Sequence, residues 1–312
     1  MKNKVLVTGG TGFLGKAVCS ELLSSGYSEV VSVGSKDFDL RSQVSVQDML
    51  SQHRPDCVIH LAATVGGIGA NKENPGKFMY ENLIMGTNLI ESCRNFETKK
   101  FVMVGTVCAY PKFTEVPFKE EDIWNGYPEE TNAPYGVAKK ALMQLVQSYH
   151  QQYGFNGVNL IPVNMYGPHD NFDPAISHVI PALILKFHQA MENSPNSDVE
   201  IWGTGSASRE FLYVEDCARA IRISMEEHED PDPVNIGTNS EINIRELAHK
   251  ISDLMGYGGN IYFNSSYPDG QPRRCLDTSK AKNMFGFEAQ VSLDEGLKRT
   301  IEWFRNDYIN NF

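Results

Sequence analysis

The stretch Thr8-Gly9-Gly10-Thr11-Gly12-Phe13-Leu14-Gly15 follows directly on the apolar run Val5-Leu6-Val7 at the start of the chain. The apolar run predicts a buried strand, and the apolar residues of Phe13–Ser24 have helical spacing. Glycines at 9, 12 and 15 therefore lie where a strand must turn into a helix. Lacking Cβ atoms, they permit the tight turn and let the backbone approach a pyrophosphate at the helix N-terminus. Three glycines alone can be only a turn, but in this context they predict a dinucleotide site.

The first half of the chain continues this alternation of strand and helix. Further strands are expected at Val30–Val33, Cys57–Leu61, Phe101–Val104 and Val158–Ile161, and helices at Phe78–Cys93 and Tyr135–Tyr153. Strands that alternate with helices imply βαβ units with right-handed crossovers. The expected fold class is α/β, a Rossmann-type doubly wound parallel sheet with a smaller α/β lobe that binds substrate.

The alternation weakens after Pro168. We expect residues 1–168 to form the dinucleotide-binding domain and residues 169–312 to form the smaller lobe. Helices are expected there at Ile180–Met191, Ile244–Met255 and Leu293–Phe304. Residues 215–238, read as a helix and a short strand, are expected to return to the first domain.

Composition argues against several classes of protein. Lys and Arg number 28 against 39 Asp and Glu, which gives a net charge of −11 and makes nucleic acid a poor partner. The 6 cysteines include no C-x-x-C pair, and we expect no metal site. No apolar run approaches the ~20 residues of a membrane span, and no signal region follows Met1. We therefore expect a cytoplasmic protein without a membrane partner.

The run Gly34-Ser35-Lys36-Asp37 follows the second strand, where a side chain would contact the adenosine ribose. A hydroxyl and a cation suit a 2′-phosphate, so Ser35 and Lys36 favour NADP, used as NADPH, over NAD. Lys36 could also be a solvated loop charge, and Asp37 keeps NAD possible.

Tyr135 and Lys139 form a Y-x-x-x-K motif, whose spacing places both side chains on one face of a helix. A nearby lysine is expected to lower the pKa of the phenol, so that the tyrosine exchanges a proton near neutrality. Thr106 follows the strand Phe101–Val104, at the edge of a parallel sheet where ligands bind. The motif alone could lie on a surface helix. With Thr106 and a nicotinamide it forms a site for hydride transfer between a carbonyl and an alcohol.

Other motifs resemble those of a known family. The glycine loop, His60-Leu-Ala-Ala63, Thr106, the Tyr135/Lys139 motif and Val163-Asn-Met-Tyr-Gly-Pro168 resemble an extended short-chain dehydrogenase/reductase of the nucleotide-sugar type. Narrower stretches resemble the GDP-L-fucose synthase family, and they are Val65–Ile68, Cys108–Lys112, Tyr166–Phe172, Ser177–Pro181, Ile201–Gly205 and Arg209–Phe211. That family epimerises GDP-4-keto-6-deoxy-D-mannose at C3 and C5 and reduces it at C4.

The resemblance implies NADPH, a GDP-4-keto-6-deoxy sugar and a homodimer. It implies that Cys108 and His178 are the acid/base pair of epimerisation, with Thr106, Tyr135 and Lys139 as the reductase residues. The implied substrate contacts are Lys186, Trp202, Arg209 and Asp277, which would supply cations for the diphosphate, an aromatic ring for stacking and an acid for guanine or ribose. The implied cofactor contacts are Gly9, Gly10, Thr11, Gly12, Phe13, Leu14, Gly15, Ser35, Lys36, Asp37, Leu61, Ala62, Ala63, Lys139, Pro162, Asn164, Met165 and His178.

Several alternatives stay open. Without the motif, Cys108 would read as a small buried hydrophobe, His178 as a loop histidine, and Trp202 as core. The family commonly has serines where this chain has Thr106 and Val107; the threonine keeps the hydroxyl, and the valine removes a polar neighbour. A 4-reductase, with or without epimerisation, acting on a related GDP-4-keto sugar such as a 6-deoxyheptose would use the same residues. A 4,6-dehydratase is disfavoured because Val107-Cys108 replaces the Asp-Glu of that class. A cofactor-sensing regulator would not need these catalytic residue types.

Overall fold

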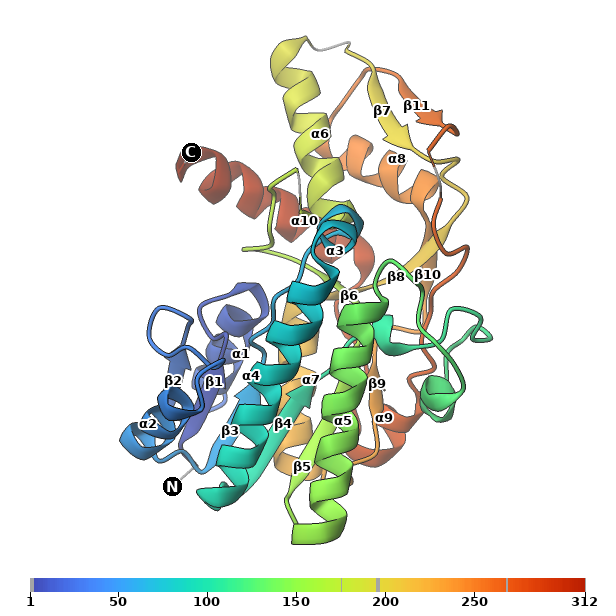
Figure 1. Ribbon diagram of the computed structural model, residues 1–312. Coiled ribbons are helices and arrows are strands. Elements are labelled where there is room, and N and C mark those ends of the chain that lie inside the picture. The colour runs from blue at the N-terminus through green and yellow to red at the C-terminus, as the bar shows by residue number, and fades with distance from the viewer. Residues whose placement is uncertain (1–2, 175, 195–196, 268, 312) are drawn as a thin grey trace.

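The computed structural model describes residues 3–174, 176–194, 197–267 and 269–311 (Figure 1). Its central sheet has six parallel strands in the order β2-β1-β3-β4-β5-β9. These strands are β1 (Val5–Thr8), β2 (Val30–Val33), β3 (Cys57–His60), β4 (Lys100–Val104), β5 (Gly157–Pro162) and β9 (Val234–Ile236). The strand order reverses at β1, with β2 on one side and β3 on the other, and ligands bind at the carboxyl ends of strands at such a point. The α/β Rossmann-type prediction is confirmed.

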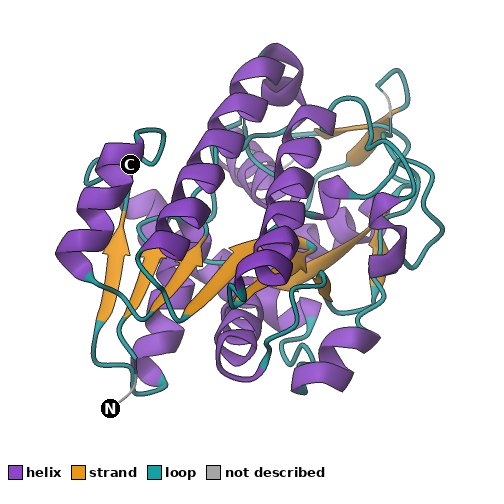
Figure 2. Cartoon of the chain, turned by 60° about the horizontal axis from the view of Figure 1, so that its bottom comes forward, coloured by secondary structure: helices purple, strands orange, loops and turns teal. Residues whose placement is uncertain are grey.

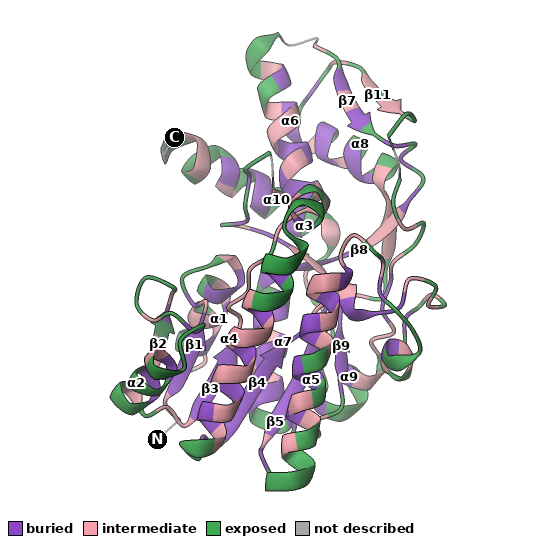
Figure 3. Cartoon of the chain, viewed as in Figure 1, coloured by how far each residue is buried: buried purple, intermediate pink, exposed green. Residues whose placement is uncertain are grey.

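Helices cover both faces of this sheet (Figure 2). On one face α4 packs beside α5, and on the other α1 packs beside α7. The helices of this layer are α1 (Phe13–Ser24), α2 (Gln43–His53), α3 (Ile68–Glu73), α4 (Pro75–Asn95), α5 (Ala133–Tyr153), α7 (Val214–Glu227) and α9 (Ser279–Phe285). Short 3₁₀ helices occupy Val107–Ala109 and Glu120–Trp124. Figure 3 shows buried residues along the strands and along the inner sides of these helices.

A smaller lobe lies above the sheet in Figure 1. It contains the strand group β10-β8-β6 and the parallel pair β11-β7. Its elements are β6 (Asn164–Tyr166), α6 (Val179–Asn193), β7 (Val199–Trp202), β8 (Ser208–Tyr213), β10 (Glu241–Asn243), α8 (Ile244–Met255), β11 (Ile261–Asn264) and α10 (Leu293–Trp303), which a π turn (Phe304–Tyr308) and a 3₁₀ turn (Ile309–Asn311) prolong. A separate apolar cluster around Phe187 and Phe304 forms its core.

The chain passes between the two parts more than once. β6 pairs with β8 of the lobe, whereas β9 pairs with β5 in the central sheet. The boundary at residue 168 therefore stays a prediction. Among the described residues, no helix is long and apolar enough to cross a membrane, and no cluster of three His, Cys, Asp or Glu side chains could hold a metal ion.

Candidate active site

A cleft of about 1480 Å³ lies between the carboxyl ends of the central strands and the lobe. Its lining includes the glycine loop after β1, Thr106 after β4, the first turn of α5, His178 before α6, and Arg209 in β8. The topology thus brings residues from distant parts of the sequence to one hollow.

The glycine loop is packed so closely that it excludes side chains. Gly9 has a φ of 71°, and a Cβ there would lie 2.8 Å from the Ala62 nitrogen. A Cβ on Gly15 would lie 2.1 Å from the Gly9 carbonyl oxygen. Helix α1 begins after Gly12, which brings no side chain to its first amides. Free amides at the start of a helix bind phosphate groups, so this cradle fits the diphosphate of a dinucleotide.

Most expected cofactor contacts line the cleft. They are Gly9, Thr11, Gly12, Phe13, Leu14, Gly15, Ser35, Leu61, Ala62, Ala63, Lys139, Pro162, Asn164, Met165 and His178. Gly10, Lys36 and Asp37 lie outside this lining. The Asp37 carboxylate instead accepts a hydrogen bond from the Gly34 amide at 2.8 Å.

Arg41 lines the same end of the cleft, and our sequence reasoning missed it. Its guanidinium donates to the Asp39 carboxylate at 2.9 and 3.0 Å and to Glu81 at 3.0 Å. Glu81 comes from α4, far along the chain, so no local pattern indicated that this arginine would be held at the cleft.

Thr106, Tyr135 and Lys139 come together where β4 ends. The Thr106 hydroxyl accepts a hydrogen bond from the Cys108 amide at 3.2 Å and is also hydrogen-bonded to the Tyr135 phenol. Lys139 is buried, and its ammonium donates to the Val104 carbonyl at 3.0 Å. Burial lowers the pKa of Lys139 to about 8, so most of its ammonium remains charged at neutral pH.

The structure does not show the lowered pKa that we expected for Tyr135. Burial raises the pKa of this phenol above its usual value, the neighbouring Cys108 adds to the rise, and the Thr106 hydrogen bond opposes it. The Lys139 ammonium is directed at the Val104 carbonyl. Tyr135 is therefore a protonated phenol across the physiological range, which suits a proton donor.

Cys108 and His178 both line this part of the cleft. Cys108 is half-buried, and an Nη1 of Arg274 lies 3.7 Å from its sulfur. Gln271 accepts from Arg274 Nη2 at 3.0 Å and thereby holds the guanidinium. The His178 side chain is exposed at the cleft wall, but the surrounding protein withdraws enough water to lower its pKa, so the ring is neutral near pH 7.

The far end of the cleft carries cations and aromatic rings. Arg209 and Trp202 line it as expected, together with Arg274 and Tyr267, which we had not predicted. Partial burial and the nearby charge of Arg274 lower the pKa of Arg209 to about 10. The guanidinium groups of Arg209 and Arg274 repel each other in this poorly hydrated cleft, and an anion such as a diphosphate would stabilise both.

Two expected substrate contacts lie outside this lining. The Lys186 ammonium donates to the Glu200 carbonyl at 3.0 Å and lies 5.4 Å from the centre of the Trp202 ring. Asp277 accepts from the Ser279 amide at 2.9 Å, beside α9. An acid that does line the cleft near these rings is Asp269, which accepts from the Thr204 amide at 2.7 Å and from its hydroxyl at 2.8 Å.

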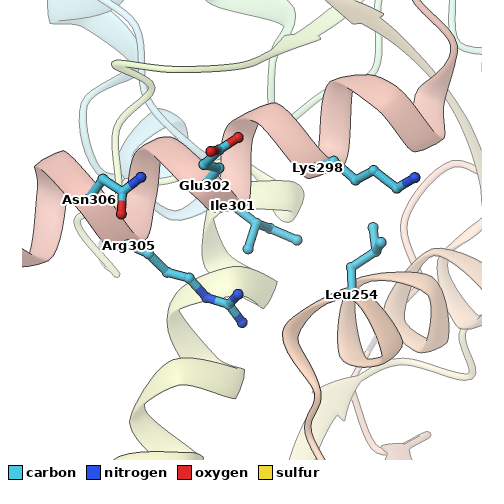
Figure 4. Close-up of a pocket in the computed structure, with 6 residues that line it drawn as sticks. All are labelled: Leu254, Lys298, Ile301, Glu302, Arg305 and Asn306. Carbon is cyan, nitrogen blue, oxygen red and sulfur yellow. The ribbon is translucent and has the colours of Figure 1, made fainter.

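A second cavity, of about 390 Å³, lies between α8 and α10 (Figure 4). Its lining residues are Leu254, Lys298, Ile301, Glu302, Arg305 and Asn306. Arg305 is already engaged, since it donates to the Met255 carbonyl at 2.8 Å. None of the residues with expected chemistry lies there, and the large cleft remains the candidate site.

The comparison with protein families agrees with this geometry. The model of the NAD dependent epimerase/dehydratase family matches residues 5–237. The chain belongs to this family. The GDP-L-fucose synthase of Escherichia coli (strain K12), a related protein, is 39% identical over 313 residues, which cover 97% of this chain and 97% of that protein.

Solved structures of the family are similar over the whole chain. A GDP-L-fucose synthetase from Naegleria fowleri bound to NADP has a TM-score of 0.92 and 32% identity, covering 99% of this chain and 94% of that one. A GDP-6-OMe-4-keto-L-xylo-heptose reductase from C. jejuni has a TM-score of 0.91 and 29% identity, covering 98% and 99%. The resemblance to nucleotide-sugar enzymes of the extended short-chain dehydrogenase/reductase type is confirmed.

Proposed function

We propose that this chain uses NADPH to convert GDP-4-keto-6-deoxy-D-mannose to GDP-L-fucose, by epimerisation at C3 and C5 and reduction at C4. The observation that carries the proposal is one cleft lined by the glycine cradle, by Thr106, Tyr135 and Lys139, and by Cys108 and His178. The 39% identity to a GDP-L-fucose synthase over nearly the whole chain supports the substrate.

Reduction needs an electrophilic C4 and a proton for its oxygen. The glycine cradle would hold NADPH, which would supply the hydride. The hydroxyls of Thr106 and Tyr135, already hydrogen-bonded to each other, hold the C4 oxygen, and Tyr135 donates its proton to that oxygen. Lys139, which is buried and lines the cleft, would offer a charged donor to the nicotinamide ribose.

Epimerisation uses the same carbonyl. C3 and C5 are both α to C4, so their protons are acidic, and the two hydroxyls that polarise the ketone also stabilise the enolate oxygen. Cys108 and His178 exchange the carbon-bound protons, one residue removing a proton from one ring face and the other returning one to the opposite face. The Arg274 guanidinium donates to the Cys108 sulfur at 3.7 Å and thereby orients it in the cleft.

The deciding experiment measures deuterium incorporation from D₂O into GDP-4-keto-6-deoxymannose without NADPH, and then product stereochemistry with NADPH. We expect exchange at C3 and C5 by the parent and much slower exchange by Cys108→Ser, which should still reduce the ketone. Cys19→Ser is the control, because Cys19 lies on α1 outside the cleft. Equal exchange by the parent and Cys108→Ser would contradict the role of Cys108.

A parent protein that reduces C4 but exchanges neither proton would be a 4-reductase. This second candidate, acting on a related GDP-4-keto-6-deoxy sugar or heptose, is favoured by the structural similarity to the C. jejuni heptose reductase. The homodimer and the cytoplasmic location stay predictions. Light scattering on the purified protein and fractionation of its source cells would test them.

A further inference from the structure

Two aromatic rings stack on each other at the end of the cleft that carries Arg209. Trp202 is the last residue of β7, and Tyr267 lies in the loop after β11. Their ring centres are 4.5 Å apart, and their planes differ by 11°. Trp202 is 60% exposed and Tyr267 is 40% exposed, and both line the cleft. Paired flat rings left open at a cleft wall form a surface suited to another flat ring.

Hydrogen bonds fix the two segments that carry these rings, the end of β7 and the loop after β11. β7 and β11 are parallel neighbours in which Trp202 is opposite Asn264, and the Gly203 amide donates to the Asn264 carbonyl at 2.9 Å. Beyond the rings, Asp269 accepts from both the amide and the hydroxyl of Thr204. The pair is therefore preorganised, and a ligand that stacks on it does not have to order these segments first.

The neighbouring charges indicate which flat ligand fits. A Cβ on Gly270 would lie 3.6 Å from Arg209 Nη2, so the Tyr267 loop runs directly beside that guanidinium. Arg209 and Arg274 together suit a diphosphate, and a nucleoside continues from a diphosphate with its base a few ångströms further on. The ring pair lines the same cleft as both arginines, and Tyr267 lies on the loop that approaches Arg209.

We propose that Tyr267 is a nucleobase-stacking residue that, with Trp202, forms an aromatic platform for the guanine of the substrate. The inference rests on the proposed function, because it takes the substrate to be a GDP-sugar. It adds a residue that none of the sequence motifs indicated, and it places part of the substrate affinity in the loop after β11.

The test is calorimetric titration of the full-length protein with GDP and, separately, with inorganic diphosphate. Tyr267→Ala should weaken GDP binding by roughly 5- to 150-fold, the range of one base–aromatic stack, and leave diphosphate binding unchanged. Tyr267→Phe keeps the ring and should bind GDP like the parent. Tyr262→Ala is the matched control, because Tyr262 lies on β11, is 48% exposed, and is outside the cleft lining.

The outcomes separate the inference from the proposed function. A parent protein that binds no GDP refutes the proposed substrate. A parent that binds GDP, with Tyr267→Ala binding it equally well, refutes only the role of Tyr267. If Tyr267→Ala loses GDP and diphosphate to the same extent, the loop is distorted rather than the stack removed, and the inference is again wrong.

Discussion

Replacing Gly15 with alanine should cost the protein its dinucleotide affinity while leaving the fold in place. Gly15 lies in the first turn of α1, and its added Cβ would lie 2.1 Å from the Gly9 oxygen and 2.6 Å from the Gly10 Cα. Both neighbours are backbone atoms of the glycine cradle, so the contact is relieved only if the loop and the helix separate by about 1 Å. Overpacking of this kind lowers the free energy of unfolding by about 1–3 kcal/mol. The better helix propensity of alanine returns at most about 1 kcal/mol.

Such a shift opens the cradle that should hold the diphosphate, and we expect the dissociation constant for NADPH to rise at least about tenfold, since contacts of this kind depend on sub-ångström placement. Fluorescence titration measures the affinity, and urea unfolding measures the free energy of unfolding. Gly76→Ala is the matched control: Gly76 is exposed in the first turn of α4, and a Cβ there would have no atom within 4 Å. It should gain roughly 0.5–1 kcal/mol and bind NADPH normally. A Gly15→Ala protein with the affinity of the parent would refute the cradle argument.

Further predictions concern the site and the stability of the fold. Tyr135→Phe should reduce the ketone on the order of 10²–10⁴ times more slowly, because the proton donor is lost, while NADPH titration shows unchanged affinity; near-parental rates would contradict its role. Arg41→Ala should weaken the binding of NADPH by about tenfold and the binding of NADH little. This is the lower end of the range for a charged hydrogen bond, because Arg41 is half exposed and also paired with two carboxylates. Lys36→Ala should change the ratio of NADPH to NADH affinity less than Arg41→Ala does, because Lys36 lies outside the cleft lining. A larger effect of Lys36→Ala would show that Lys36 binds the 2′-phosphate. Burial raises the pKa of Asp170 to about 7, so the native carboxyl keeps a proton that the unfolded chain releases, and stability falls as pH rises from about 4 to 7. Asp170→Asn lacks this loss. In urea unfolding, the free energy of unfolding of this variant relative to the parent should be on the order of 2 kcal/mol higher at pH 8 than at pH 5. The exposed control, Asp48→Asn, should show no such difference between the two pH values.

Elements of the central layer, and helix α8 of the lobe, could be predicted because their signals are local. The apolar run Val30–Val33 and the helical period of Phe13–Ser24 and Ile244–Met255 have the bounds that the sequence indicated. Helix α2 was missed, because only Val46, Met49 and Leu50 of its eleven residues are buried, too few to give a clear period. A helix that buries so little of its surface leaves little trace in an apolar pattern.

The strands of the lobe could not be predicted in the same way. β7 and β11 are four residues each and pair with each other across a long separation, with Val199 opposite Ile261. β6 has three residues and forms part of a sheet only through β8. Such short strands are stabilised by partners distant in sequence, and their own composition carries a weak signal.

The residues of the candidate site also differ in whether their sequence signals are local. Thr106, Tyr135 and Lys139 could be found because each stands at a fixed offset from a strongly patterned strand or helix. Arg274 could not be found in this way. It belongs to the site because its guanidinium lies 3.7 Å from the Cys108 sulfur, and the two residues are far apart in the sequence. The acid expected to contact the nucleotide shows the same difficulty. Asp277 was chosen by resemblance, but it lies outside the cleft lining, whereas Asp269 lies within it.

The groups that would react with the sugar and the groups that would recognise the nucleotide lie on different parts of the fold. The groups that would react with the sugar are held by β4 and α5, where burial of Lys139 and packing against the sheet fix their positions. The groups that would recognise the nucleotide are Trp202, at the end of β7, and Tyr267, in the loop after β11. These segments belong to the lobe and contact one another rather than the central sheet. Substitutions in those segments can therefore change the preferred nucleotide without moving the proton donor. Arg274 is the exception, because it contacts Cys108 and raises the local positive charge beside Arg209 at once. A substitution there should alter substrate affinity and proton exchange together, whereas Tyr267→Ala should alter affinity alone.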